Sequence, residues 1–252
     1  MYRPPSYREF KKFVGELTGE ASACHVALLY LSKLAEPFEW TVKAREQGIK
    51  LDGIENDVIL KSQVKLSIVS LYSGFDIFIQ KITTESKEFG LAWIKKEKVS
   101  PLVKVSANFT AVPKNKTELR QLHDCIDYYR LLRNYIVHPS DGNKDDVCEF
   151  YEAKKQSIDS VREKYNSSGA PSHPDLVSFY DVKFLCRILL DASEEIAQLL
   201  KPTEEQLYKV IPFEQWSKFK GNEKSTKRAA TNYLITEYGL VEAKELVDRM
   251  YK

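Results

Sequence analysis

The feature that most constrains the fold is a helical spacing of apolar residues, which returns in almost every ordered stretch of the chain. It is clearest where apolar side chains alternate at intervals of four and three: Val64, Ile68, Leu71, Phe75, Phe78 and Ile82. This spacing puts the side chains on one face of an α-helix, and that face must be buried against other elements. The sequence therefore predicts an amphipathic helix of about 25 residues, with Ser62 as its N-cap.

The same spacing predicts four further helices. They cover about residues 20–34, 117–138, 145–165 and 178–200. Proline cannot continue a helix, so Pro37 marks the end of the first. The connection over residues 99–115 contains two prolines and is expected to be an irregular excursion or a short hairpin. The predicted fold class is all-α, an antiparallel helical bundle with longer connections than an ideal four-helix bundle.

The character of the sequence changes after Pro202. Two shorter amphipathic segments follow, one interrupted at Pro212 and the other near Gly239. A chain of 252 residues is long enough for one large domain, or for one domain with an appendage. We therefore expect a helical bundle over residues 1–201 and a C-terminal helical appendage over residues 202–252.

Composition argues against several classes of protein. No apolar run approaches the roughly 20 residues that span a bilayer, and residues 7–20 are charged throughout, unlike a signal peptide. The cysteines are scattered, with no pair spaced for a zinc or thioredoxin-like site: Cys24, Cys125, Cys148 and Cys186. We expect a protein of the reducing cytoplasm with no membrane partner, no metal and no cofactor. The net charge of +2 neither demands nor excludes a nucleic-acid partner.

The residues that carry chemistry lie at the end of the helix predicted over residues 117–138. Arg133, Asn134 and His138 fall within less than two helical turns, and Pro139 follows at once. Arginine binds phosphate oxygens bidentately, and histidine exchanges protons near neutral pH. An amide can donate to a phosphate or fix a histidine tautomer. Together these side chains could cut an RNA phosphodiester without a metal ion.

Arg133 breaks the apolar pattern of its own helix. The stripe of that helix consists of Leu119, Leu122, Ile126 and Tyr129. Arg133 takes the next position on the same face, where a guanidinium costs free energy unless it is paired or opens onto a cleft. Such a break in a local rule is typical of functional sites. Pro139 disfavours helix at the residue before it, which predicts a helix end at His138.

An alternative interpretation of these residues stays open, because the spacing of an arginine and a histidine is common enough to arise by chance. In it, Arg133 is a structural arginine that pairs with Asp76 or Asp127. His138 is then a surface histidine that caps the C-terminus of a helix.

Two segments of the chain resemble a known family. Residues 131–138, Leu-Leu-Arg-Asn-Tyr-Ile-Val-His, resemble the Arg-polar-x(3–5)-His signature of HEPN domains (higher eukaryotes and prokaryotes nucleotide-binding). Residues 71–78, Leu-Tyr-Ser-Gly-Phe-Asp-Ile-Phe, resemble the aromatic and acidic helix that precedes the signature helix. In architecture the resemblance covers about residues 20–200. The region after Pro202 has no familiar match.

The resemblance implies a site and a chemistry. Arg133 would hold the scissile phosphate and stabilise its developing charge. His138 would act as general base on the ribose 2′-OH or as general acid to the leaving 5′-oxygen, with Asn134 in support. Asp76 would orient Arg133 from the neighbouring helix. The chain departs from the family at Pro139, where many members have glycine or another small residue.

The resemblance also implies a biological setting. Family members often dimerise, so that two copies of the motif form one cleft. Many are metal-independent endoribonucleases of toxin–antitoxin, abortive-infection or CRISPR-associated defence. The expected protein is therefore a cytoplasmic homodimer that cleaves RNA to a 2′,3′-cyclic phosphate, a toxin or effector with an antitoxin or defence-complex partner. A non-catalytic scaffold in a defence complex is the second expectation. A nucleotide-binding bundle paired with a nucleotidyltransferase is the third.

Other residues are weaker candidates for RNA binding. Tyr128 and Tyr135 could stack on bases, whereas Tyr129 lies on the apolar stripe and is expected to pack in the core. A basic cluster could bind the RNA backbone or a protein partner: Lys218, Lys220, Lys224, Lys227 and Arg228. The alternative for this cluster is an ordinary solvated face.

Overall fold

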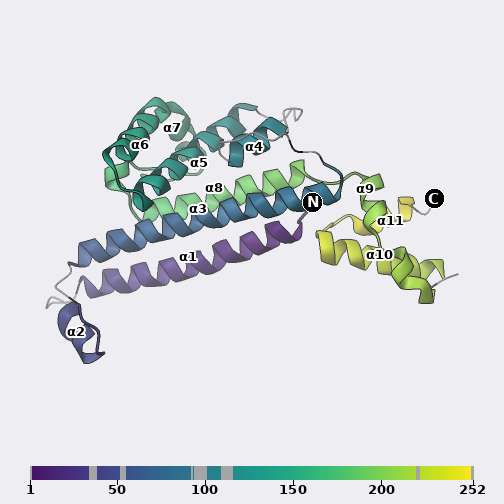
Figure 1. Cartoon of the computed structure of the whole chain (residues 1–252), viewed down its shortest axis with the longest axis horizontal. Helices are drawn as coiled ribbons and strands as arrows, with labels where there is room; N and C mark the ends of the chain where they lie inside the picture. Colours follow the sequence, from purple (N-terminus) through teal and green to yellow (C-terminus); the bar gives the residue numbers. More distant parts are fainter. Residues whose placement is uncertain are drawn as a thin grey trace. The chain divides into compact units, whose positions relative to one another are not determined.

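The structure is a computed structural model that describes residues 2–33, 39–51, 55–91, 93, 101–108, 116–219 and 222–250. Every regular element in these residues is a helix and no strand occurs among them, so the predicted all-α bundle class is confirmed (Figure 1). None of the helices in the described part of the chain has the length and apolarity that a membrane span requires.

The described residues form a succession of helices. In chain order they are α1 Pro5–Leu31, α2 Trp40–Glu46, α3 Asn56–Glu88, α4 Pro101–Asn108, α5 Lys116–Val137, α6 Asp141–Ala153, α7 Lys155–Lys164, η1 Pro174–Leu176, α8 Phe179–Leu199, α9 Glu204–Val210, η2 Phe213–Phe219, α10 Glu223–Tyr238 and α11 Ala243–Met250. The helices predicted from apolar spacing correspond to α1, α3, α5, the pair α6 and α7, and α8.

Several predicted boundaries are wrong for identifiable reasons. Helix α3 begins at Asn56, so Ser62 lies inside the helix and does not cap it. The partly buried Ile59 and Leu60 extend the helix towards its N-terminus. Residues 101–108, expected to be irregular, form α4, which proline can open because the first helical N–H has no partner in the helix. Residues 109–115 of that connection lie outside the described residues.

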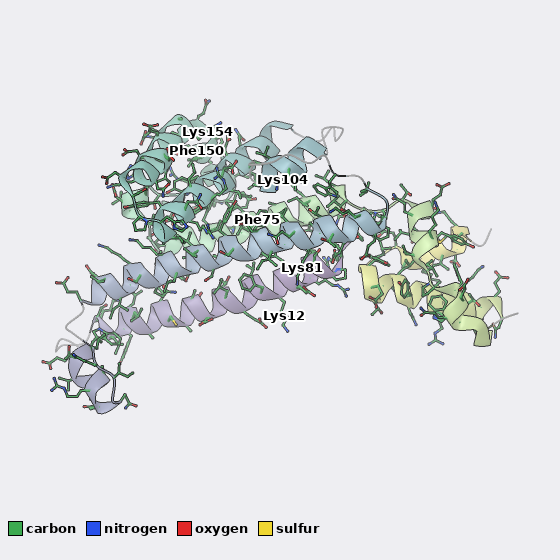
Figure 2. The ribbon with its side chains drawn as sticks, in the orientation of Figure 1. Lys12, Phe75, Lys81, Lys104, Phe150 and Lys154 are labelled. Carbon is green, nitrogen blue, oxygen red and sulfur yellow. The ribbon has the colours of Figure 1, made fainter. Side chains whose placement is uncertain are left out.

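The single helix predicted over residues 145–165 is two helices, α6 and α7, which meet at Lys154. The backbone of Lys154 leaves ideal helical geometry, with φ −106° and ψ 10°. Its N–H donates to the carbonyl of Phe150 at 2.9 Å, and its carbonyl accepts from the N–H of Ile158 at 2.9 Å. Figure 2 labels Phe150 and Lys154 at this junction. Helical hydrogen bonding therefore continues across a local change of direction.

Contacts group the chain into two units. The first contains residues 1–12, 75–114 and 190–252, and the second contains residues 13–74 and 115–189. Helices α1, α3 and α8 contribute residues to both units. This grouping does not follow the division expected after Lys201, which stays a prediction.

The core of the first unit joins the beginning of the chain to its last helices. Its buried residues are Tyr2, Phe89, Leu207, Ile211, Ala230, Leu234, Leu240, Ala243, Leu246 and Val247. The N–H of Arg3 donates to the carbonyl of Tyr238 at 3.2 Å. Nε2 of Gln206 donates to the carbonyl of Phe89 at 2.6 Å. The segment after Pro202 is therefore packed into the core of this unit.

The second unit packs α5 against α6 and α7, and it contains adjoining parts of α1, α3 and α8 (Figure 1). Nε2 of Gln63 on α3 donates to the carbonyl of Ala21 on α1 at 3.3 Å. Oγ1 of Thr18 on α1 and Sγ of Cys186 on α8 lie 2.9 Å apart. Polar contacts thus connect α1 to α3 and to α8 within this unit.

The ring of Phe13, a side chain of α1, lies close against Gly74 of α3 in the second unit. A Cβ added to Gly74 would overlap Cε1 of Phe13 and lie 2.8 Å from its Cδ1. Gly15, also inside a helix, has nothing within 4 Å of the corresponding position. The two glycines therefore differ in the space available to a methyl group.

Alanine substitutions at the two glycines are expected to change stability in opposite directions. Gly15→Ala should raise the free energy of unfolding by about 0.5–1 kcal/mol, the usual gain in helix propensity. Gly74→Ala should lower it by about 1–3 kcal/mol, because overpacking exceeds that gain. Urea unfolding followed by circular dichroism measures both values. A Gly74→Ala protein as stable as Gly15→Ala would contradict the close contact between the ring of Phe13 and Gly74.

Candidate functional site

The motif lies where α5 ends and α6 begins, and the helix end predicted at His138 is confirmed. The N–H of His138 donates to the carbonyl of Asn134 at 2.8 Å, which is the last helical hydrogen bond of α5. Nδ2 of Asn143 on α6 donates to the carbonyl of His138 at 2.6 Å. Oγ of Ser140 accepts from the N–H of Asn143 and caps α6. The backbone of His138 is thus held on both sides, while its side chain is exposed.

Arg133 is partly buried, and its guanidinium is only partly satisfied. Nη1 donates to Oδ1 of Asn134 at 3.1 Å, whereas Nε is buried with no hydrogen-bond partner among the described residues. None of the described carboxylates of the second unit forms an ion pair with it, and Asp127 pairs instead with Arg130 at 3.0 Å. Asp76 and Arg133 belong to different units. The expected role of Asp76 in orienting Arg133 therefore stays a prediction.

The buried Nε of Arg133 has an energetic consequence. An unsatisfied buried donor costs about 1–3 kcal/mol, and more when it is charged. A guanidinium has five N–H donors and no acceptor, so one bond to Asn134 leaves most of its capacity unused. An anionic ligand with several oxygens is the chemical group that would best fill this capacity.

Arg133 and His138 do not face the same way from one helix. Successive residues of an α-helix are rotated by about 100°, so five residues correspond to about 140° around the axis. The burial agrees with this rotation, since Arg133 is partly buried and His138 is exposed. His138 follows α5 directly and its N–H still makes the helical bond to Asn134, so within one copy the guanidinium and the imidazole lie on different sides of the helix axis.

A buried carboxylate anchors α5 to the start of α8. Asp181 is fully buried, and its Oδ1 accepts from the hydroxyl of Tyr129 at 2.9 Å and from the N–H of Ser172 at 2.9 Å. Its Oδ2 accepts from Oγ of Ser172 at 2.7 Å and from the N–H of Ser178 at 2.9 Å. These donors compensate the cost of removing the carboxylate from water. Burial, and then the charge of Asp181, raise the pKa of Tyr129 far above its ordinary value, so its hydroxyl stays protonated and donates.

The prediction that Tyr128 stacks on bases is wrong, whereas the core position of Tyr129 is confirmed. The ring of Tyr128 is fully buried, and its hydroxyl donates to the carbonyl of Ser172 at 2.6 Å. Its centroid lies 5.5 Å from that of Tyr151 on α6. Helix α5 buries a second side against α6 and α7, which a single apolar stripe does not reveal. Tyr135 is partly buried and remains a candidate for RNA binding.

The basic cluster lies in the first unit, and only part of it is described. Lys224, Lys227 and Arg228 on α10 line one groove together with Lys244 of α11. The side chain of Lys218 and the whole of Lys220 lie outside the described residues. Sequence reasoning missed Lys244, because only the packing of α11 against α10 brings it to the cluster. Across the described ranges, no group of three or more His, Cys, Asp or Glu side chains could hold a metal ion.

Replacing Asp181 by asparagine is expected to destabilise the second unit. The amide nitrogen must replace one carboxylate oxygen, and either oxygen accepts from a backbone N–H, of Ser172 or of Ser178. Two donors would then face each other, at a cost of about 3 kcal/mol in the free energy of unfolding. Urea unfolding gives the value, and the exposed Asp145→Asn serves as control, within about 0.5 kcal/mol of wild type. Equal stability of the two variants would show that the network contributes little.

Comparison with known proteins found no relative of this chain. No family model matches the sequence, and neither the search of curated proteins nor that of solved structures found a match. The resemblance to HEPN domains therefore depends on the two segments over residues 71–78 and 131–138, and it remains a prediction.

Proposed function

We propose that the chain is a metal-independent endoribonuclease of the HEPN type, which cleaves single-stranded or looped RNA. The observation that carries the proposal is the state of Arg133. Its guanidinium is partly buried, its Nε has no hydrogen-bond partner among the described residues, and no described carboxylate of its unit neutralises it. It lies less than two helical turns before the exposed His138. A cation left with free donors suits the binding of a phosphodiester, and a histidine close to it in sequence can supply the proton transfer that cleavage needs.

The reaction is a transfer within the RNA strand. The ribose 2′-oxygen attacks the neighbouring phosphorus, so the P–O2′ bond forms and the P–O5′ bond breaks. The products are a 2′,3′-cyclic phosphate and a free 5′-hydroxyl. One proton leaves the 2′-OH and one is delivered to the 5′-oxygen. Charge builds on the phosphate oxygens between these events, and a positioned guanidinium stabilises that charge.

The three motif residues have distinct roles in this proposal. Arg133 binds the phosphate oxygens, and His138 transfers a proton as general base or general acid. Asn134 supports both, because its Oδ1 accepts from Nη1 of Arg133 and its carbonyl accepts from the N–H of His138. Tyr135 is an accessory candidate for contact with a base.

A homodimer would complete the site. Within one copy, Arg133 and His138 point about 140° apart around the axis of α5. In a two-fold dimer the same surface of both copies meets, so Arg133 of one copy can face the imidazole of the other across a single phosphate. In line with the HEPN resemblance, the enzyme would be a cytoplasmic toxin or defence effector, restrained by an antitoxin or a defence-complex partner.

The second candidate function is a non-catalytic interaction module in a defence complex. The same divergence of Arg133 and His138 within one copy favours it, because a chain that stays monomeric would not bring the two groups together. Arg133 would then bind an acidic group of a partner protein. The two experiments below separate this candidate from the nuclease.

Wild-type protein is expected to cleave single-stranded RNA in the presence of EDTA, and His138→Ala should lose at least about 100-fold in rate, the usual share of general acid–base catalysis. Arg133→Ala should lose about 100- to 1000-fold. His173→Ala, which removes a histidine from the turn before η1, is the matched control and should keep wild-type activity. Gel electrophoresis of end-labelled RNA gives the rates, and mass spectrometry identifies the cyclic phosphate. Equal cleavage by wild type and His138→Ala, or none by wild type, would remove the proposal.

Mixing two inactive variants tests whether the site is shared between copies. Arg133→Ala and His138→Ala chains, unfolded together and refolded at equal concentration, form mixed dimers that retain one Arg133 and one His138 on opposite chains. If the two residues act across the dimer, activity should return to about a quarter of the wild-type rate, because half of the dimers are mixed and each keeps one of its two pairs. Refolding each variant alone is the control. Activity that stays absent in a mixture shown to contain mixed dimers would contradict a shared site.

A further inference from the structure

The first unit carries a basic groove between α10 and α11. Its volume is about 590 Å³. Four cations line it, together with two carboxylates: Lys224, Lys227, Arg228, Lys244, Glu223 and Asp248. The groove lies entirely within residues 223–248 of the first unit, so it is separate from the motif on α5, which belongs to the second.

The groove follows from the pattern of α10. Residues four apart lie above one another on a helix, so 223, 227 and 231 form one row and 224, 228 and 232 form the adjacent row. Both rows line the groove. The buried residues of this helix, Ala230 and Leu234, belong to the core of the unit. Helix α10 therefore has an apolar face for packing and a wide polar face that α11 extends with Lys244.

The charges of the groove do not cancel. Nζ of Lys227 lies 2.6 Å from Oε1 of Glu223, so these two neutralise each other. Within the described part of the chain, no ion pair engages Lys224, Arg228 or Lys244. Against the one remaining carboxylate, that of Asp248, three cations leave a net charge of +2 in the groove. An exposed excess of this size attracts an anionic ligand.

We propose that this groove binds the phosphodiester backbone of a single-stranded nucleic acid. Lysine and arginine are the usual ligands of phosphate oxygens, and the hydroxyl of Thr231 and the amide of Asn232 can donate to phosphate or sugar oxygens. A volume of about 590 Å³ is within the range of sites that enclose small ligands, which suits a short stretch of one strand.

The lining also indicates what is recognised. Its side chains are charged or carry a hydroxyl or an amide, and none is aromatic, so the groove offers no ring on which a base could stack. Binding should therefore depend on charge and be indifferent to base sequence. A protein partner fits less well, because protein interfaces are anchored by buried aromatic and apolar groups that this lining lacks. The inference goes beyond the proposed cleavage, since it concerns binding by the first unit and would stand if His138 were inert.

The test uses the full chain and a fluorescein-labelled single-stranded DNA oligonucleotide. Its lack of a 2′-OH prevents the proposed cleavage, so anisotropy reports binding alone. Lys224→Glu/Arg228→Glu is expected to weaken binding at least about tenfold, and to reduce the slope of log Kd against log salt by about 1.4, or 0.7 for each lost phosphate contact. The matched control is Lys87→Glu/Lys209→Glu, which makes the same change in net charge at exposed sites of the same unit. It should stay within about twofold of wild type. Circular dichroism verifies that both variants fold.

Three results would overturn the inference: no binding by wild type at low salt, an equal loss in both double variants, or binding to phosphatidylserine vesicles without binding to the oligonucleotide. The outcome is also separable from that of the proposed function. Wild type that binds DNA through the groove but cleaves no RNA would refute only the nuclease. Wild type that cleaves RNA while the groove variant binds normally would refute only the groove.

Discussion

The second unit depends on the compensation of one buried charge, the carboxylate of Asp181. Its four principal hydrogen bonds come from α5, from the turn before η1 and from the residue that precedes α8. An ionised carboxylate tolerates burial only while such donors stay in place, so the segments that supply them cannot shift independently. Tyr129, one of the donors, lies one helical turn before Arg133 on the same side of α5. The network that satisfies Asp181 therefore holds α5 one helical turn from Arg133.

In the candidate site the backbone is well held, but the hydrogen bonding of Arg133 is incomplete. Asn134 binds the Arg133 guanidinium through its side chain and the His138 backbone through its carbonyl, so the three residues are held as one group. The buried Nε of Arg133 nevertheless lacks a partner among the described residues. Arg162 of the same unit also has a buried Nε without a partner, but its other nitrogens donate to a carboxylate and to a backbone carbonyl, whereas Arg133 makes only the bond to Asn134. A phosphate is expected to bind at Arg133 because the backbone there is fixed while several N–H donors of the guanidinium are unused.

Apolar spacing predicted the long helices, because a strong 3.6-residue period leaves few other structures possible. It also predicted that Arg133 would interrupt the core-facing line, while Pro139 predicted that α5 would end at His138. It missed whatever depends on tertiary packing. Burial of Tyr128 requires a second contact face of α5, the bend at Lys154 has no local signal, and Lys244 reaches the groove only through a neighbouring helix. The unsatisfied state of Arg133 was equally hidden, since it depends on which carboxylates the fold brings near.

The packing of Tyr2 with α9, α10 and α11 affects the order in which the two units can fold during synthesis. The core of the first unit contains both Tyr2 and Val247, so it cannot close before nearly the whole of this sequence has been translated. Contacts between residues so distant along the chain also form late, because a long loop must first be ordered. The motif on α5 is synthesised well before that moment. A nascent chain would thus carry Arg133 and His138 before the first unit could close its core.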